Sequence, residues 1–325
     1  MWYSYDFLGQ TVLNHDTFDF PDDINAVVSS HIETLSVKLP LCLIKKNDCS
    51  TIKQRQMNEM ANINEGLIAK YKPLIQEFSL MDDTFMSKVF EDKECAELVL
   101  SIILGKKLKV VNVKTQYGID NLHGRSIRLD IRAVDTSSNL YDIEIENDQK
   151  RATPKRGRFN ISIMDTDVLD KNEPWDKLPE TYMIFITRDD VLGGNKPIYH
   201  IDRTIRELNH KLFDDETHII YVPSKMQDDT ELGRLMHDFN CKDPSKMYNK
   251  ILAERTGYFK NSEEGVSVMC AIMEQVADER ERETILKCIK QLMINCKFTI
   301  EQAMQSIGIP KEEEDIYIDM FKKSK

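Results

Sequence analysis

The sequence predicts an α/β protein in which helices flank a mixed β-sheet. Residues 126–135 (SIRLDIRAVD) and 140–147 (LYDIEIEN) alternate apolar and polar side chains, the period of two that is typical of half-buried strands. Residues 180–187 (ETYMIFIT) form an apolar run bounded by turn signals, which indicates a buried central strand. Around these strands, apolar residues recur at helical spacing, so helices are expected to cover the sheet.

The chain of 325 residues divides into three regions on this basis. Residues 1–62 are rich in turn sequences and are expected to be an atypical leader. Residues 63–245 contain the strands, and residues 246–325 show helical spacing throughout. In that last region Thr299 and Gln302 predict a capping box, and two short helices are expected at 300–307 and 311–321.

Composition limits the cellular setting. No run of about 18 apolar residues occurs, so no membrane association is expected. The first ten residues lack the basic and apolar regions of a secretory signal. Seven scattered cysteines form no CxxC pair, which favours reduced thiols in a cytoplasmic protein.

Acidic side chains gather on the predicted hairpin. Asp130 belongs to its first strand, and Glu144 and Glu146 share the polar face of the second. Direct pairing of Asp130 with Glu144 places Ser137 at the centre of the loop, which predicts an odd-length loop or a bulge rather than a two-residue turn. Asp142 is expected at the solvent edge of the same face. Because like charges repel, this cluster calls for a cation, and hard carboxylate oxygens suit Mg²⁺ or Mn²⁺.

A basic segment follows the hairpin directly, at residues 149–159 (QKRATPKRGRF). The net charge of −11 argues against a protein that coats nucleic acid, but it leaves room for a local basic groove. The segment is either a solvated loop or helix start, or a set of phosphate contacts. Its place beside the acids favours DNA contacts by Lys150, Arg151, Lys155 and Arg156.

Five stretches resemble, in order and spacing, the PD-(D/E)XK nuclease family transposases, which belong with the recombination-promoting nucleases of bacteria. The stretches are residues 81–104, 124–130, 141–146, 179–190 and 233–243. The resemblance implies a restriction-endonuclease-like core with a C-terminal helical extension, and a Mg²⁺-dependent endonuclease acting on DNA in the bacterial cytoplasm. It also implies that Asp130 and Glu144 bind the metal and that Glu97, on the helix at 94–104, assists them.

Position 146 differs from the family pattern. Glu146 stands where the wider superfamily has lysine and near relatives have glutamine. A carboxylate cannot supply the positive charge of lysine, but it can accept a proton from water or bind a second metal ion. In this interpretation the catalytic set is Asp130, Glu144, Glu146 and Glu97.

Other interpretations remain open at this stage. Arg128 and Arg132 flank Asp130, so the acids could form a structural ion-pair network, and Glu94 rivals Glu97 on its helix. A degenerate nuclease fold that binds nucleic acid or protein is the alternative function. A transposase proper lacks support, because no separate DNA-recognition domain is evident. The helical C-terminal region is a candidate for homodimer formation.

Overall fold

The structure is a computed structural model and describes residues 65–121 and 124–323. The chain separates into the units Met1–Asn58 and Glu59–Lys325, and every described residue belongs to the second unit. The leader expected at residues 1–62 lies outside the described residues.

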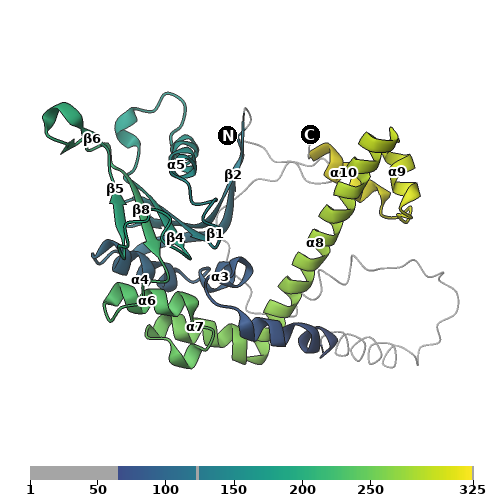
Figure 1. Ribbon diagram of the computed structural model, residues 1–325, viewed down its shortest axis with the longest axis horizontal. Helices are drawn as coiled ribbons and strands as arrows, with labels where there is room; N and C mark the ends of the chain where they lie inside the picture. The colour runs from purple at the N-terminus through teal and green to yellow at the C-terminus, as the bar shows by residue number, and fades with distance from the viewer. Residues whose placement is uncertain (1–64, 122–123, 324–325) are drawn as a thin grey trace, which may run out of the picture. The chain divides into compact units, whose positions relative to one another are not determined.

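A mixed six-stranded sheet, in the order β1-β2-β3-β4-β8-β5, forms the centre of the described unit (Figure 1). β1, β2 and β3 pair antiparallel, β3, β4 and β8 pair parallel, and β5 is antiparallel to β8. The mixed α/β class expected from the sequence is therefore confirmed. The strands are β1 (Val110–Ile119), β2 (Ile127–Asp135), β3 (Leu140–Glu146), β4 (Thr181–Thr187), β5 (Tyr199–Ile201) and β8 (Thr217–Pro223), with a separate ribbon of β6 (Thr204–Ile205) and β7 (Lys211–Leu212).

Helices cover both faces of this sheet (Figure 1). One face packs against a helix at 65–77 and against α3 (Asp83–Val89), α4 (Lys93–Leu104), α6 (Glu231–Asn240) and α7 (Lys250–Asn261). On the other face, α5 (Pro154–Val168) is the helix that packs among the described residues. Single 3₁₀ turns lie at η2 (Trp175–Lys177), η3 (Arg206–Leu208) and η4 (Pro244–Lys246).

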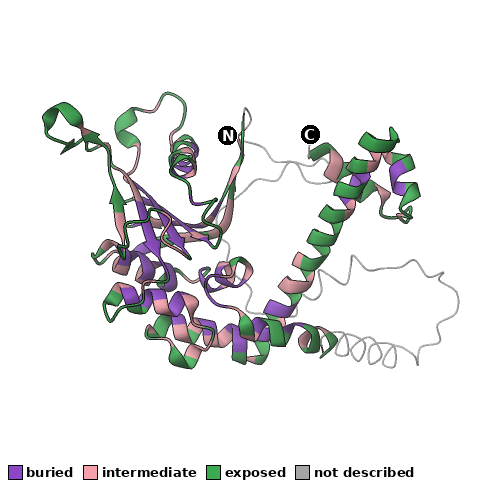
Figure 2. Ribbon diagram, viewed as in Figure 1, coloured by how far each residue is buried: buried purple, intermediate pink, exposed green. Residues whose placement is uncertain are grey.

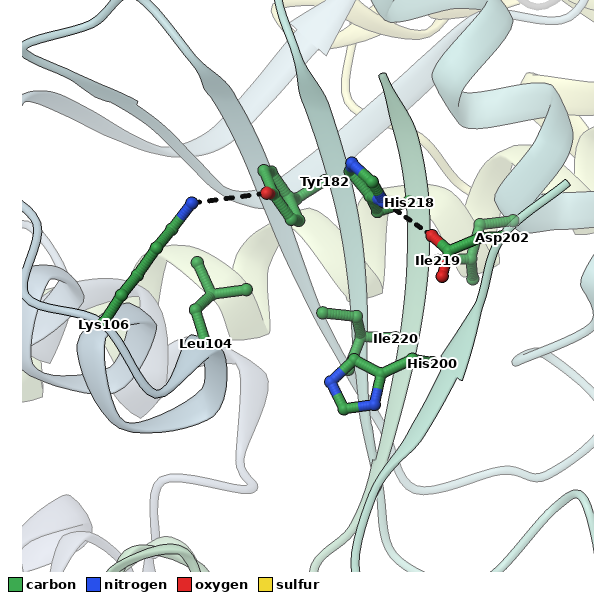
Figure 3. A pocket seen from close by; sticks show the side chains of 8 residues that line it. All are labelled: Leu104, Lys106, Tyr182, His200, Asp202, His218, Ile219 and Ile220. Carbon is green, nitrogen blue, oxygen red and sulfur yellow. Dashed lines mark hydrogen bonds and ion pairs between the residues drawn. The ribbon is translucent and has the colours of Figure 1, made fainter. Parts of the chain in front are cut away.

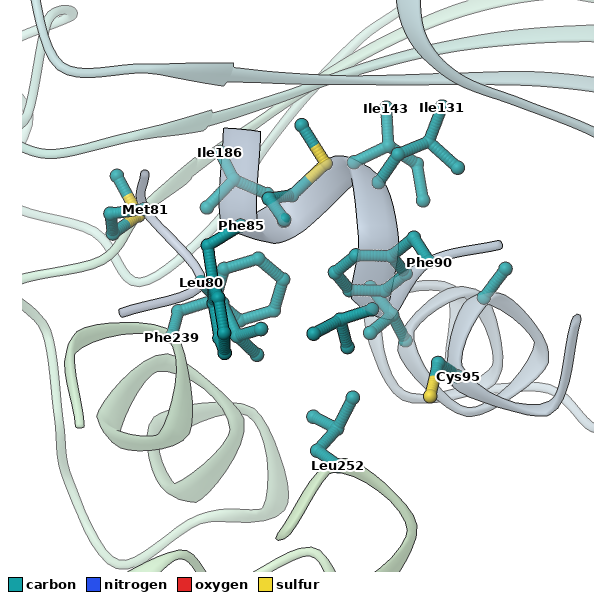
Figure 4. Packing of buried hydrophobic residues seen from close by; sticks show 14 of the residues in the cluster. Leu80, Met81, Phe85, Phe90, Cys95, Ile131, Ile143, Ile186, Phe239 and Leu252 are labelled. Atoms are coloured by element: carbon teal, nitrogen blue, oxygen red, sulfur yellow. The ribbon is translucent and has the colours of Figure 1, made fainter. Parts of the chain in front are cut away.

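The main core lies between the sheet and the helices on the face opposite α5 (Figure 2). Alternate residues of the strands, such as Ile131, Ile143 and Ile186, point toward Phe85 and Phe90 from the helices (Figure 4). All of these side chains are fully buried, so the apolar half of each alternating strand faces this layer. The polar half must then face α5.

Asp238, at the end of α6, holds the turn that leads into α7. Its buried carboxylate accepts hydrogen bonds from the backbone amides of Tyr248 and Asn249, both at 2.8 Å. These amides precede α7, which has no side-chain cap of its own. α7 also adds Leu252 and Phe259 to the main core, so the helical region begins as part of the sheet's own core.

The helical region continues as α8 (Glu263–Cys296), α9 (Ile300–Ser306) and α10 (Glu314–Lys323). The start of α8 belongs to the main core through Met269 and Cys270, and its last turns pack with α9 and α10 around Tyr317. The expected capping box of Thr299 and Gln302 is present. α10 begins at Glu314 rather than at residue 311, because residues 311–313 form a turn. Within the described ranges, no helix is both long and apolar enough to cross a membrane.

Candidate active site

The hairpin of β2 and β3 has the register expected from the sequence. Ile131 is opposite Ile143 and Val134 is opposite Leu140, so the loop between them is odd in length and centred on Ser137. The Asp135 carboxylate fixes this loop by accepting hydrogen bonds from the amides of Ser137 and Asn139, at 2.8 and 2.9 Å. The same register brings Asp130 beside Glu144.

The backbone pairing of β2 with β3 ends at Ile131 and Ile143. Beyond that point the Asp130 side chain acts as the acceptor that a backbone carbonyl of β2 would otherwise supply, since its Oδ2 accepts a hydrogen bond of 3.0 Å from the amide of Ile145. The backbone amide of Ile145 therefore points toward β2. The carbonyl of Glu146 points the other way, toward β4, and accepts a hydrogen bond from the backbone amide of Arg188. The two strands part at the place where the acids lie.

The acids of β3 face α5, not solvent. Asp142 and Glu144 are 0% exposed and Glu146 is 3% exposed. The expectation that Asp142 lies at the solvent edge is therefore wrong. α5 begins at Pro154, inside the basic segment, and its first turn is capped by Thr153.

Neither carboxylate oxygen of Asp142 has a hydrogen-bond partner within 3.5 Å, although the buried Asn160 of α5 lies near enough to lower the pKa of this carboxyl. Arg132 is its cross-strand neighbour, but the Arg132 guanidinium lies 3.8 Å from Asp167 on α5 instead. One oxygen of Glu144, Oε1, is likewise buried with no hydrogen-bond partner within 3.5 Å, although the backbone amide of Asp130 lies near enough to lower the pKa of this carboxyl. Unpaired buried carboxyl oxygens are costly, so these two side chains mark a place where the fold is not optimised for stability.

Arg156, in the first turn of α5, provides the main positive charge against the acids. Its guanidinium donates hydrogen bonds to Glu144 Oε2 and to Glu146 Oε1, and so bridges the two side chains. α5 can approach this closely because its next residue is Gly157, where an added Cβ would lie 3.1 Å from the Phe185 ring. Arg151 is a second, mostly exposed partner, 3.5 Å from Glu146.

Two further side chains reach Asp130 from the other side. Gln116 of β1 donates its amide to Asp83 at 2.8 Å and to Asp130 at 3.4 Å. Gln116 has a φ of +52°, a left-handed conformation that is rare for a non-glycine residue inside a strand. Asp83, the first residue of α3, is thereby linked to Asp130 through Gln116, and its charge helps to raise the pKa of Asp130.

Glu97 is not brought to this cluster. Its carboxylate accepts a hydrogen bond of 3.0 Å from the amide of Val110 and lies 3.5 Å from the Lys109 ammonium. Val110 is six residues before Gln116 on β1, which corresponds to about 20 Å along a strand. Glu97 therefore joins α4 to the start of β1. The helix acid linked to Asp130 is Asp83, not Glu97 as expected from the sequence.

Burial and mutual repulsion raise the pKa values of the clustered acids. Burial raises the pKa of Glu144 to about 8, aided by the charge of Asp130 and opposed by Arg156. Burial raises the pKa of Asp130 to about 6, although the hydrogen bond from Ile145 opposes the change. Burial also raises the pKa of Asp142, and the charge of Glu144 adds to the effect. The cluster thus holds protons, or accepts cations, more readily than isolated carboxylates do.

The chemistry of these side chains fits a hard divalent cation. Within the described residues, no three Asp, Glu, His or Cys side chains converge as a metal-binding group. Mg²⁺, however, is usually held by one or two carboxylates together with water and substrate phosphate. Asp130 and Glu144 supply two such carboxylates, and the buried Oε1 of Glu144 has no other partner. In the structure, Arg156 provides positive charge to the same Glu144 carboxylate.

The basic segment is divided between the interior and the surface. Lys150, Arg151 and Lys155 are exposed after the end of β3. Arg156 is only 25% exposed and points to the acids. Three of the four side chains expected to contact DNA are therefore free to do so, and the fourth is engaged inside the site.

A pocket of about 220 Å³ lies elsewhere, on the side of the sheet opposite α5 and at the other end of β4 and β8 (Figure 3). His218 lies between Asp202, at 2.6 Å, and Glu180, at 3.2 Å, and stacks on Tyr182. The Tyr182 hydroxyl donates a hydrogen bond to the same Glu180 oxygen, so the two stacked rings share one carboxylate. The sequence does not suggest this pocket, and none of the clustered acids lines it.

Comparison with protein-family models, with curated proteins and with solved structures finds no match to this chain. The function must therefore be argued from the acid cluster itself. Sequence reasoning missed Asp83 and Gln116 there, because nothing in their local pattern indicates a long-range contact. The helix start near Arg156 did have a signal, since Thr153 followed by Pro154 is a common way to begin a helix.

Proposed function

We propose that this protein is a metal-dependent DNA endonuclease with a PD-(D/E)XK-type site, related to the recombination-promoting nucleases. The single observation that carries the proposal is the adjacency of Asp130 and Glu144 where β2 and β3 part, with a buried, unpartnered oxygen on Glu144. The pair lies on β2 and β3 inside a six-stranded sheet with helices on both faces, as a preorganised site requires. The family resemblance of the sequence points to the same two residues.

In the proposed mechanism, Asp130 and Glu144 hold Mg²⁺ or Mn²⁺, with the Ile145 peptide group directed to the same side. The ion, when bound, lowers the pKa of water and offsets charge on the phosphate. Glu146 accepts the proton of the attacking water. Its carboxylate is held in position for this task by contacts with Arg156 and Arg151.

Lys150, Arg151 and Lys155 bind the DNA backbone in this proposal. They are exposed and lie in the segment between β3 and the first turn of α5, directly after Glu146. Contacts from lysine and arginine to phosphate give affinity without sequence specificity and weaken as salt rises. Cleavage is therefore expected to tolerate many sequences.

Plasmid nicking tests the proposal. Wild-type protein with Mn²⁺ should nick supercoiled DNA, and Asp130→Ala or Glu144→Ala should abolish nicking. If Glu146 accepts the proton, both Glu146→Gln and Glu146→Ala should lose about 100-fold in rate, the scale of general-base catalysis. Full activity in the Asp130 and Glu144 variants would refute the proposal, and a faster Glu146→Gln enzyme would refute the role of Glu146.

A second function has one observation in its favour. Arg156 already bridges Glu144 and Glu146, as it would in a degenerate nuclease fold whose acids serve structure and whose surface binds nucleic acid or protein. Calorimetry separates the two functions. DNA binding with no uptake of Mg²⁺ or Mn²⁺ would favour the binding module over the enzyme.

Homodimer formation through the helical C-terminal region is part of the proposal, because cutting both DNA strands requires two sites. Ile294, near the end of α8, is 71% exposed, and Phe298 and Ile307 nearby are also exposed. Light scattering should show a dimer that Ile294→Glu converts to a monomer. A monomeric wild-type protein would exclude this assembly.

A further inference from the structure

Arg156 is placed where its charge competes directly with any cation that the acids bind. Its guanidinium contacts Glu144, which the proposed function assigns to the metal, and Glu146, which it assigns to the water. Glu144 Oε1 is buried without a partner, so Arg156 satisfies only half of this carboxylate. The arrangement leaves Glu144 able to accept a cation, but only next to a guanidinium.

A divalent cation and a guanidinium on the same buried carboxylate repel each other strongly, because the interior screens charge less than water does. The side chain of Arg156 has a way out. It is 25% exposed and belongs to the first turn of α5. The nearby basic side chains Arg151 and Lys155 are exposed.

We propose that Arg156 is a built-in counter-cation that a divalent metal displaces from Glu144, and that the released guanidinium then binds a phosphate of the DNA. This inference rests on the proposed function and deepens it, because it couples metal binding to substrate binding through one side chain. Before the metal arrives, Arg156 prevents repulsion between Glu144 and Glu146. Afterwards, it adds a bidentate phosphate contact beside the reacting bond.

Calorimetric titration with Mn²⁺ in the absence of DNA tests the displacement. Arg156→Gln removes the competing charge and should bind Mn²⁺ about tenfold more tightly than wild type, as expected for loss of a like charge in a partly buried site. Arg158→Gln is the matched control, because Arg158 is exposed on the same helix and contacts none of the acids. It should stay within about twofold of wild type, since exposed charges are screened. Equal affinities in the two variants would overturn the displacement.

The phosphate contact has its own measurement. Fluorescence anisotropy with a DNA duplex, in Ca²⁺ and then in EDTA, should show that the metal strengthens DNA binding by wild type and by Arg158→Gln. Arg156→Gln should lose that gain. An unchanged gain would overturn the second half of the inference.

Two controls keep this inference separate from the proposed function. If wild type nicks DNA with Mn²⁺ but Arg156→Gln binds Mn²⁺ no more tightly, only the inference fails. If wild type neither binds Mn²⁺ nor nicks DNA, the proposed function fails as well. Should Arg156→Gln not fold, as judged by circular dichroism, Arg156→Lys decides: lysine cannot span both carboxylates, so its Mn²⁺ affinity should exceed that of wild type, and equal affinity would overturn the inference.

Discussion

Replacing Asp142 with asparagine should stabilise the protein. Asp142 is fully buried, both of its oxygens lack a hydrogen-bond partner, and it shares the α5-facing side of β3 with Glu144. An amide of the same shape carries no charge and cannot repel Glu144 or Asp130. The native state should therefore gain free energy from a substitution that most buried polar sites would not tolerate.

The expected gain follows from the free energy of keeping a proton on the buried carboxyl, about 1.36 kcal/mol for each pH unit above its ordinary pKa until the raised pKa is reached, a cost that an amide does not have. Its pH dependence has a definite sign. Burial raises the pKa of Asp142 in the folded state, so folded Asp142 holds its proton at a pH where the unfolded chain has lost it. The wild-type penalty is absent below the ordinary pKa of about 3.9 and grows as pH rises toward the raised pKa. The advantage of asparagine should therefore be larger at pH 8 than at pH 5.

Urea unfolding in EDTA, followed by circular dichroism at both pH values, measures this difference. Asp176→Asn is the control, because Asp176 is an exposed acid outside the cluster and its substitution should change little. If Asp142→Asn is less stable than wild type at pH 8, then Asp142 is ionised and well paired in solution. A gain that does not depend on pH would refute the assignment of the effect to charge.

Three further outcomes are expected. Mn²⁺ affinity measured by calorimetry should fall as pH drops from about 8 to about 6, because Glu144 and Asp130 then take up protons with pKa values of about 8 and 6; a constant affinity would contradict this. Glu97→Gln should keep nicking activity within about twofold and lose about 1 kcal/mol of unfolding free energy, since it bonds a backbone amide; complete loss of nicking would return Glu97 to the site. Asp238→Ala should lose about 2–3 kcal/mol in urea unfolding, because two backbone amides before α7 lose their acceptor; an unchanged midpoint would contradict it.

The local features of the fold could be predicted from the sequence because local patterns determine them. Alternation fixed which residues of β2 and β3 share a face, and the sum of the two positions fixed the register around Ser137. The capping box of Thr299 and Gln302 follows equally from short-range spacing. These predictions needed no knowledge of what packs on the sheet.

The environment of the site could not be predicted in the same way. Alternation shows that Asp142 and Glu144 share a face, but not that α5 covers it, because the covering helix is a long-range contact. The same limit hid Asp83, which lies 47 residues before Asp130 and is joined to it by Gln116. Arg156 was expected among surface phosphate contacts, because a basic segment carries no local signal of which side chain turns inward.

The central claim is that Asp130 and Glu144 together form a metal site rather than a structural ion-pair network. Calorimetric titration with Mn²⁺ at pH 8, comparing wild type with the double variant Asp130→Asn/Glu144→Gln, tests it most directly. We predict that wild type takes up Mn²⁺ and that the double variant, still folded by circular dichroism, takes up none. Failure of the wild type to bind Mn²⁺, or equal uptake by the double variant, would contradict the account.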